Sequence, residues 1–127
     1  MFATTLEECI ITPEEIQVLN DVAHKCHMQA KIMGWHKRPR EDGTRFALIH
    51  SEISEALEAN RKTTMDDHLP HRCGEEVELA DAVIRIFDHI GLKGMDIGAA
   101  MAEKGVYNQN RADHQLANRN LAGGKQY

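Results

Sequence analysis

The sequence predicts an all-α protein, a helical bundle of about four main helices that is completed by oligomerisation. Three observations predict this class. Apolar residues recur at helical spacing in four segments, helix start and stop signals delimit those segments, and aromatic residues make up only 5% of the 127 residues. At this length we expect one domain over residues 1–127, with its core in about residues 12–111.

Residues 1–11 are expected to form an irregular or short leading arm before the first helix. Thr12 can cap that helix, Pro13 suits its first position, and Glu15 completes a capping box. The helix should run to about Met33 and end at Gly34. Its apolar stripe consists of Ile16, Leu19, Val22, Ala23 and Cys26.

A polar loop over residues 34–43 carries Trp35, the only tryptophan of the chain. Trp35 is either a packing anchor or a ring that stacks on a base or caps a pocket. The next helix is predicted from about Thr44 to Asn60, followed by a polar connection over residues 61–73. The histidines of that connection, His68 and His71, are interpreted as solvated loop residues.

The third helix is predicted from about Gly74 to Leu92. The apolar stripe of the second helix comprises Phe46, Ile49, Ile53, Ala56 and Leu57, and that of the third comprises Val77, Ala80, Val83, Ile84 and Phe87. Leu79, Ile86 and Ile90 widen the third helix's apolar arc to about half its circumference. Because a lone subunit would leave part of this arc in water, we expect an obligate homodimer, or a homotetramer built as a dimer of dimers.

Gly94 stops the third helix, and Asp96 can cap a fourth from about Ile97 to Asn110. Lys104, Asn108 and Arg111 lie on one side of this helix. They form either an exposed polar face or a row of donors for phosphate oxygens. The tail over residues 112–127 has no apolar period and is expected to be flexible or to fold over something.

Charge and cysteine content exclude several classes of protein. The net charge of −5, without a basic stripe, argues against non-specific nucleic-acid binding. Cys9, Cys26 and Cys73 lack CxxC spacing, so they are interpreted as reduced thiols of a cytoplasmic protein, not as a disulfide framework or a zinc site. No run of 18 apolar residues is present, and Glu7 and Glu8 stand where a signal peptide would be basic and then apolar, so no membrane partner is expected.

Two acidic pairs provide the strongest indication of chemistry. Glu52 and Glu55 lie three residues apart on the second helix, as do Glu78 and Asp81 on the third. This spacing leaves the members of a pair about 60° apart around a helix. Such pairs are either solvated surface or, because these stand beside apolar stripes, ligands of a hard cation such as Mg²⁺.

Carboxylates that hold a cation, together with basic donors, indicate cleavage of a phosphate ester or phosphoanhydride by a metal-activated water. A ferritin-like di-iron oxidoreductase is the rival enzyme class, and it uses Glu-x-x-His pairs. None of the eight histidines has a Glu three residues before it, so that class is rejected. A non-catalytic helical oligomer or interaction module with surface acids stays open as the alternative.

Glu52-x-x-Glu55, a gap of 22 residues and Glu78-x-x-Asp81 resemble the ExxE…ExxD signature of the all-α nucleoside triphosphate pyrophosphohydrolases, which include the MazG-like proteins and the dimeric dUTPases. The stretch from Lys104 through Asn108 to Arg111 is similar to the family's K-x-x-x-N-x-x-R motif. The likeness covers roughly residues 12–111 and indicates a single MazG-like module.

The resemblance implies a helical bundle closed by oligomerisation and a Mg²⁺-dependent enzyme, with Mn²⁺ as a substitute. The reaction would convert a nucleoside or deoxynucleoside triphosphate and water to the monophosphate and pyrophosphate, with alarmone nucleotides as alternative substrates. It assigns Glu52, Glu55, Glu78 and Asp81 to the metal, and Lys104, Asn108 and Arg111 to the phosphates. Either Glu52 or Glu55 would deprotonate the water. The family's usual Pro-rich His-Gly continuation is replaced here by Ala112-Asp113-His114-Gln115.

Overall fold

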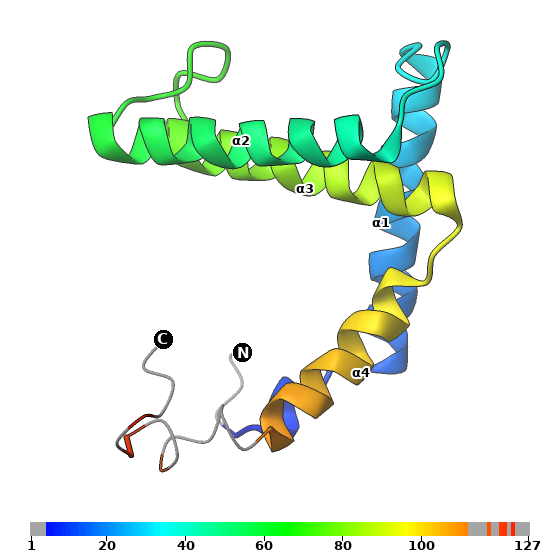
Figure 1. Ribbon diagram of the computed structural model, residues 1–127, viewed down its shortest axis with the longest axis vertical. Helices are drawn as coiled ribbons and strands as arrows, with labels where there is room; N and C mark the ends of the chain where they lie inside the picture. The colour runs from blue at the N-terminus through cyan, green and yellow to red at the C-terminus, as the bar shows by residue number, and fades with distance from the viewer. Residues whose placement is uncertain (1–4, 112–116, 118–119, 122, 124–127) are drawn as a thin grey trace. The chain divides into compact units, whose positions relative to one another are not determined.

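The computed structural model describes residues 5–111, 117, 120, 121 and 123, and its helices make this an all-α protein (Figure 1). The described elements are listed in chain order: η1 (Glu7–Cys9), a 3₁₀ helix, then α1 (Pro13–Ile32), α2 (Asp42–Lys62), α3 (Gly74–Lys93) and α4 (Ile97–Asn110). The all-α part of the predicted fold class is therefore confirmed, and its completion by oligomerisation stays a prediction. Most of the predicted flexible tail, residues 112–127, lies outside the described residues.

Side chains at the helix ends account for where α1 and α4 begin. The Thr12 backbone N–H donates to Glu15 Oε1 at 3.0 Å, and the Glu15 N–H donates to Thr12 Oγ1 at 3.2 Å, which confirms the predicted capping box. The Ala99 N–H donates to Asp96 Oδ1 at 3.0 Å, which confirms the predicted cap of α4. Helix α2 differs from its prediction at both ends, because it starts at Asp42 and continues to Lys62 before Thr63 turns left-handed with φ 53°.

The chain divides into two compact units, which are described separately. Unit 1 comprises Met1–Asn20 and Asp96–Tyr127, and unit 2 comprises Asp21–Met95. In unit 1 the side chain of Asn20 joins the first half of α1 to the start of α4. Its Nδ2 donates to Asp96 Oδ1 at 2.8 Å, and its Oδ1 accepts the Gly98 N–H at 2.9 Å. A Cβ atom at Gly98 would clash with the backbone of Ile16, so glycine permits this close contact.

In unit 2, α2 and α3 run antiparallel and side by side (Figure 1). Their contact is made by small residues. Ala56 of α2 and Ala82 of α3 are buried, and a Cβ atom at Gly74 would lie 3.2 Å from the Ala59 Cβ atom. The two buried residues of α2 are the small Ala56 and one long charged residue, Glu52.

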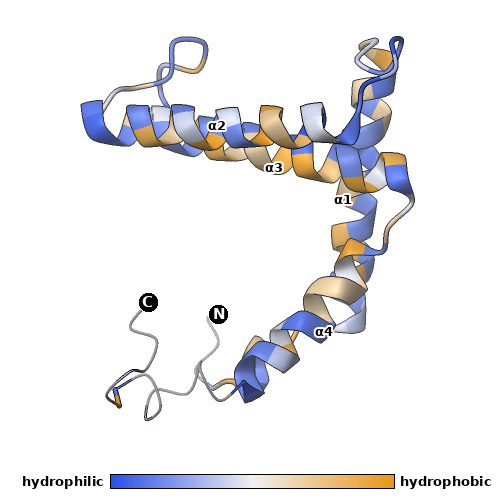
Figure 2. Cartoon of the chain, in the orientation of Figure 1, coloured by the Kyte–Doolittle hydropathy of each residue, from blue (hydrophilic) through white to orange (hydrophobic). Residues whose placement is uncertain are grey.

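The predicted apolar stripes of α2 and α3 are buried only in part within a single chain: Ala56 is buried, and Ile49, Val77 and Phe87 are half-buried. Phe46, Ile53 and Leu57 are 50%, 47% and 58% exposed, and Val83 and Ile84 of α3 are also exposed. Figure 2 shows hydrophobic residues in orange along both helices. The apolar residues buried in the described part are all alanines: Ala23, Ala30, Ala56 and Ala82. Periodicity therefore included the buried Ala56 of α2 but missed the buried Ala82 of α3.

The connection between α2 and α3 is an ordered loop. A bridge pairs Met65 with Cys73, and the Asp66 backbone N–H donates to the Arg72 carbonyl at 3.0 Å. Asp66 Oδ2 accepts the backbone N–H groups of His68 and Leu69 at 2.9 and 2.7 Å. His68 is exposed, as the solvated-loop interpretation predicted.

The state of the cysteines and the polarity of the helices were also predicted from the sequence. Cys9, Cys26 and Cys73 are free thiols, as predicted, with Cys26 partly buried and the other two exposed. Within the described residues, every helix is too short or too polar to span a lipid bilayer.

Candidate functional site

The two predicted acidic pairs face each other across the contact of α2 and α3. Glu52 and Glu55 of α2 and Glu78 of α3 each offer a carboxylate oxygen within 4.8 Å of the other two. Glu52 is buried, Glu78 is half-buried and Glu55 is exposed. With Asp81, we call these residues the acid cluster. Three of its four predicted members therefore lie close enough to share one cation.

Asp81 lies one turn further along α3 and outside the group of three mutually close carboxylates. The pKa of Asp81 is nevertheless raised, first by burial of its carboxyl and second by the negative charge of Glu52. Asp66 of the connecting loop raises it further. Asp81 is thus half-buried at the edge of the same negative field.

Repulsion within the acid cluster shows in the pKa values of its carboxyls. Burial, a hydrogen bond with Glu52 and the charges of Glu55 and Glu52 raise the pKa of Glu78 to about 7. The pKa of Glu55 is also raised, chiefly by its hydrogen bond with Glu52. A pKa of about 7 leaves the Glu78 carboxyl partly protonated at neutral pH, and a divalent cation bound there would displace that proton.

Arg85 is the one basic side chain that forms an ion pair with the acid cluster in the described part of the chain. Its Nε donates to Glu52 Oε1 at 2.8 Å. Burial opposes the charged form of Glu52, but hydrogen bonds with Arg85 and Glu55 outweigh burial and lower the pKa of Glu52. Sequence reasoning missed Arg85, although it lies four residues after Asp81 and seven after Glu78, on the same face of α3.

A cleft of about 360 Å³ opens beside the acid cluster, lined by Glu55, Glu78 and the connecting loop. Asp66 and Asp67 of that loop also line it, and sequence reasoning missed both. The single lysine in the lining, Lys62, is bound to Glu58 at 2.6 Å. This volume suits a small ligand, and the lining's negative charge favours a ligand that carries a cation.

Trp35 is half-buried in the turn after α1, and its described contacts are within the protein. The guanidinium carbon of Arg85 lies 5.6 Å from the centre of the Trp35 ring. The ring also lines a cavity of about 20 Å³. These contacts favour the packing-anchor interpretation of Trp35 and link it through Arg85 to Glu52.

The predicted phosphate donors belong to unit 1. Lys104 Nζ lies 4.4 Å from the centre of the Tyr107 ring, and the guanidinium carbon of Arg111 lies 5.8 Å from it. Asn108 is half-buried, and its side-chain Oδ1 is buried without a hydrogen-bond partner. Lys104 and Arg111 are thus brought together around one aromatic ring.

Comparison with models of protein families, with curated proteins and with solved structures finds no match to this chain. The resemblance to the all-α pyrophosphohydrolases therefore rests on the motif residues alone, and membership of that family stays a prediction. The geometry adds that Glu78, which follows Glu55 after a gap of 22 residues, meets Glu52 and Glu55 in space.

Proposed function

We propose that this chain is a Mg²⁺-dependent nucleoside triphosphate pyrophosphohydrolase. The observation that carries the proposal is the convergence of Glu52, Glu55 and Glu78, with ligand oxygens within 4.8 Å of one another. An acidic cluster alone is common on protein surfaces. Here, however, one carboxyl is buried, another has a pKa raised to about 7, and the cluster borders a cleft of about 360 Å³.

The ligand atoms of the acid cluster suit Mg²⁺ both in their chemical type and in their total charge. They are carboxylate oxygens alone, which suit a hard cation, and Mn²⁺ fits the same oxygens. Arg85 supplies one positive charge against the four acids of the cluster, so the excess negative charge is left for a cation. When bound, Mg²⁺ would neutralise the carboxylates, hold phosphate oxygens and make water more acidic.

The two glutamates of α2 are suited to different roles. Glu52 is buried and held by Arg85, so we assign it to holding the metal with Glu78, and the family resemblance adds Asp81 to these ligands. Glu55 is exposed at the cleft and its pKa is raised, which makes it the better proton acceptor. Glu55 would take a proton from the attacking water. The oxygen of that water bonds to the α-phosphorus while the α–β anhydride bond breaks and pyrophosphate leaves.

The phosphate-binding roles of Lys104, Asn108 and Arg111 come from the family resemblance. The local geometry supports them to this extent: two cationic groups flank Tyr107, and a buried Asn108 oxygen lacks a partner. Alanine in place of Lys104 or Arg111 should raise KM, or lower kcat if the contact strengthens in the transition state. Unchanged KM and kcat in a variant would show that the replaced residue is a surface residue without a role in phosphate binding.

Exposed apolar faces support the homodimer or homotetramer. Phe46, Ile53 and Leu57 of α2 are about half exposed, together with Leu79 and Val83 of α3. A chain that buries only alanines among its described apolar residues gains more hydrophobic stabilisation from a second copy. Light scattering over a dilution series tests this, and a folded, active monomer at micromolar concentration would contradict it.

Product identification tests the activity. The protein is incubated with Mg²⁺ and a panel of nucleoside and deoxynucleoside triphosphates and alarmone nucleotides. Monophosphate and pyrophosphate are expected, with Glu103→Gln, an exposed acid of α4, as the active control. Orthophosphate and diphosphate would indicate a different phosphohydrolase. No turnover, and no stabilisation by Mg²⁺ beyond an ionic-strength effect, would favour the non-catalytic helical oligomer.

A further inference from the structure

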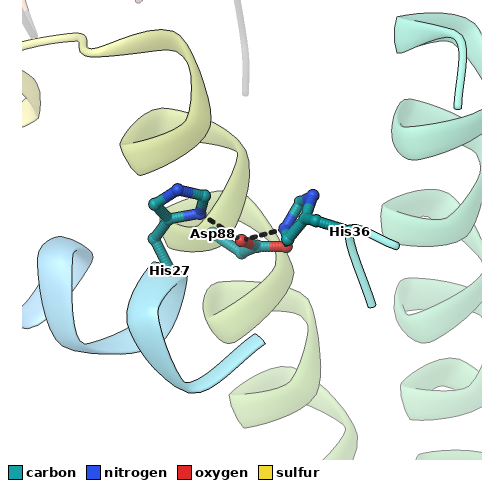
Figure 3. A group of neighbouring side chains, drawn as sticks. All are labelled: His27, His36 and Asp88. Atoms are coloured by element: carbon teal, nitrogen blue, oxygen red, sulfur yellow. Dashed lines mark hydrogen bonds and ion pairs between the residues drawn. The ribbon is translucent and has the colours of Figure 1, made fainter. Parts of the chain in front are cut away.

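Two imidazole rings converge on one buried carboxylate in unit 2, away from the acid cluster's own residues (Figure 3). His27 Nδ1 lies 2.9 Å from Asp88 Oδ1, and His36 Nε2 lies 2.7 Å from Asp88 Oδ1 and 3.0 Å from Oδ2. The side chains of His27, His36 and Asp88 are 14%, 13% and 11% exposed. We call these three residues the histidine cluster.

Two glycines make this convergence possible. Gly34 has φ +86°, a left-handed conformation that ends α1 and turns the chain so that His36 returns toward α3. Gly91 lies one turn beyond Asp88, and a Cβ atom there would clash with the His27 side chain. The close approach of α1 to α3 at Gly91 is what allows the His27 ring to reach Asp88.

We propose that the histidine cluster is a second metal site, one that takes a borderline transition-metal ion such as Zn²⁺ or Co²⁺. Two imidazole nitrogens and one carboxylate suit these ions, whereas Mg²⁺ prefers oxygen ligands alone. Among the described ion pairs, Asp88 is paired with imidazoles and with no lysine or arginine. A buried carboxylate with only these partners is a favourable ligand for a cation.

A small cavity beside the cluster provides room for a further ligand. Its volume is about 20 Å³, enough for one water molecule, and its polar lining consists of His36, Asp88, His89 and the arginines Arg40, Arg45 and Arg85. His89 is 7% exposed, and its Nδ1, like Arg45 Nε, is buried without a hydrogen-bond partner. Unpartnered polar atoms around a cavity of this size indicate a bound water, which would complete a four-coordinate site with three protein ligands.

Metal binding competes with the hydrogen bonds that hold the cluster together. Ligand atoms about 2.0–2.2 Å from a tetrahedral ion lie about 3.3–3.5 Å apart, so the contacts to Asp88 must each open by roughly half an ångström. Arg45 opposes this change, because its NH1 lies 3.4 Å from His36 Nδ1, which must carry the proton once Nε2 binds metal. Arg45→Met should therefore tighten Zn²⁺ binding by about tenfold.

The test is proton NMR of the full chain with Co²⁺, without nucleotide and in excess Mg²⁺ to occupy oxygen-only sites. Each metal-bound imidazole should give one strongly shifted N–H resonance that disappears in heavy water, so two are expected. His27→Asn and His36→Gln each keep an N–H donor toward Asp88 but remove a metal-binding lone pair, and either should abolish at least one resonance. Thermal unfolding checks that these variants fold.

His50→Gln, at an exposed histidine of α2, and Glu78→Gln should keep both resonances. Absence of the resonances in the unmodified chain, or their full retention in either His27→Asn or His36→Gln, overturns the proposal. An unchanged Zn²⁺ affinity in Arg45→Met also contradicts it. Glu78→Gln impairs the acid cluster but leaves the histidine cluster intact. The cobalt resonances therefore test the histidine cluster whether or not the proposed hydrolase activity is found.

Discussion

The acid cluster and the histidine cluster each include residues of α3 but balance their charge in opposite ways. In the acid cluster, like charges meet and one arginine offsets four carboxyls, so the pKa of Glu78 rises to about 7. In the histidine cluster, two ring nitrogens lie within hydrogen-bonding distance of one carboxylate, at 2.9 and 2.7 Å. The first arrangement needs a cation from outside the chain, whereas the second is stable without one.

This difference determines what each cluster can bind. The acid cluster gains stabilisation from any hard cation that reaches it, because the cation replaces repulsion by attraction. A metal at the histidine cluster must displace existing hydrogen bonds, so only ions with a strong preference for imidazole will compete. The comparison also predicts that removing a carboxyl from the acid cluster stabilises the metal-free protein, whereas removing an imidazole from the histidine cluster destabilises it.

The largest expected effect is on turnover. Glu52→Gln or Asp81→Asn should lower the rate of pyrophosphate release at saturating Mg²⁺ by about a hundredfold or more, because a metal-holding carboxylate is lost. His36→Gln, which keeps a donor to Asp88, should stay within a few-fold of the unmodified rate. Wild-type turnover in Glu52→Gln would show that the acid cluster is not the metal site.

Mg²⁺ binding should weaken about tenfold from pH 8 to pH 6, since a proton competes for Glu78, whose pKa is raised to about 7. Isothermal titration at several pH values measures this, and proton release should accompany binding near pH 7. A flat affinity over this range would mean that the carboxyls of the acid cluster do not repel one another when no metal is bound.

Replacing His36 by alanine should lower the free energy of unfolding by about 1–3 kcal/mol, because buried Asp88 loses a hydrogen-bond donor. His36→Gln should restore most of this loss. Chemical denaturation in the presence of a chelator measures both variants. Equal stability of the alanine variant and the unmodified chain would show that the hydrogen bond from His36 to Asp88 does not stabilise the metal-free protein.

Glu78→Gln should raise the stability of the metal-free protein by about 1 kcal/mol at pH 8. The sign follows from the raised pKa of Glu78: its proton stabilises the fold at low pH, and this contribution is lost as pH rises through about 7. At pH 5 the carboxyl is mostly protonated in the folded protein, so the variant should differ little. Destabilisation at pH 8 would contradict the repulsion within the acid cluster.

Local signals in the sequence correctly predicted the caps at the starts of α1 and α4. Thr12, Glu15 and Asp96 make the capping hydrogen bonds expected of them, because such bonds depend on residues three positions apart. The convergence of Glu52, Glu55 and Glu78 could also be anticipated, since the spacing of each pair fixes its helix face.

Features that depend on contacts between distant segments could not be predicted. His36 and Asp88 are 52 residues apart, and nothing in local spacing indicates that they meet. The buried face of α3 was misassigned because it includes Ala82, which lies outside the predicted stripe; on α2 the predicted stripe does include the buried Ala56, but its larger member Leu57 stays exposed. Burial of Glu52 depends on Arg85 from the neighbouring helix, which a stripe of apolar residues does not reveal.

Hydrolysis in oxygen-18-labelled water tests most directly the claim that the acid cluster directs water to the α-phosphorus. The unmodified chain, Mg²⁺ and a deoxynucleoside triphosphate are incubated, and both products are analysed by mass spectrometry. The label is expected in the monophosphate and not in the pyrophosphate, with both products lost in Glu52→Gln. Label in pyrophosphate or orthophosphate, or hydrolysis that persists undiminished in Glu52→Gln, would contradict the account.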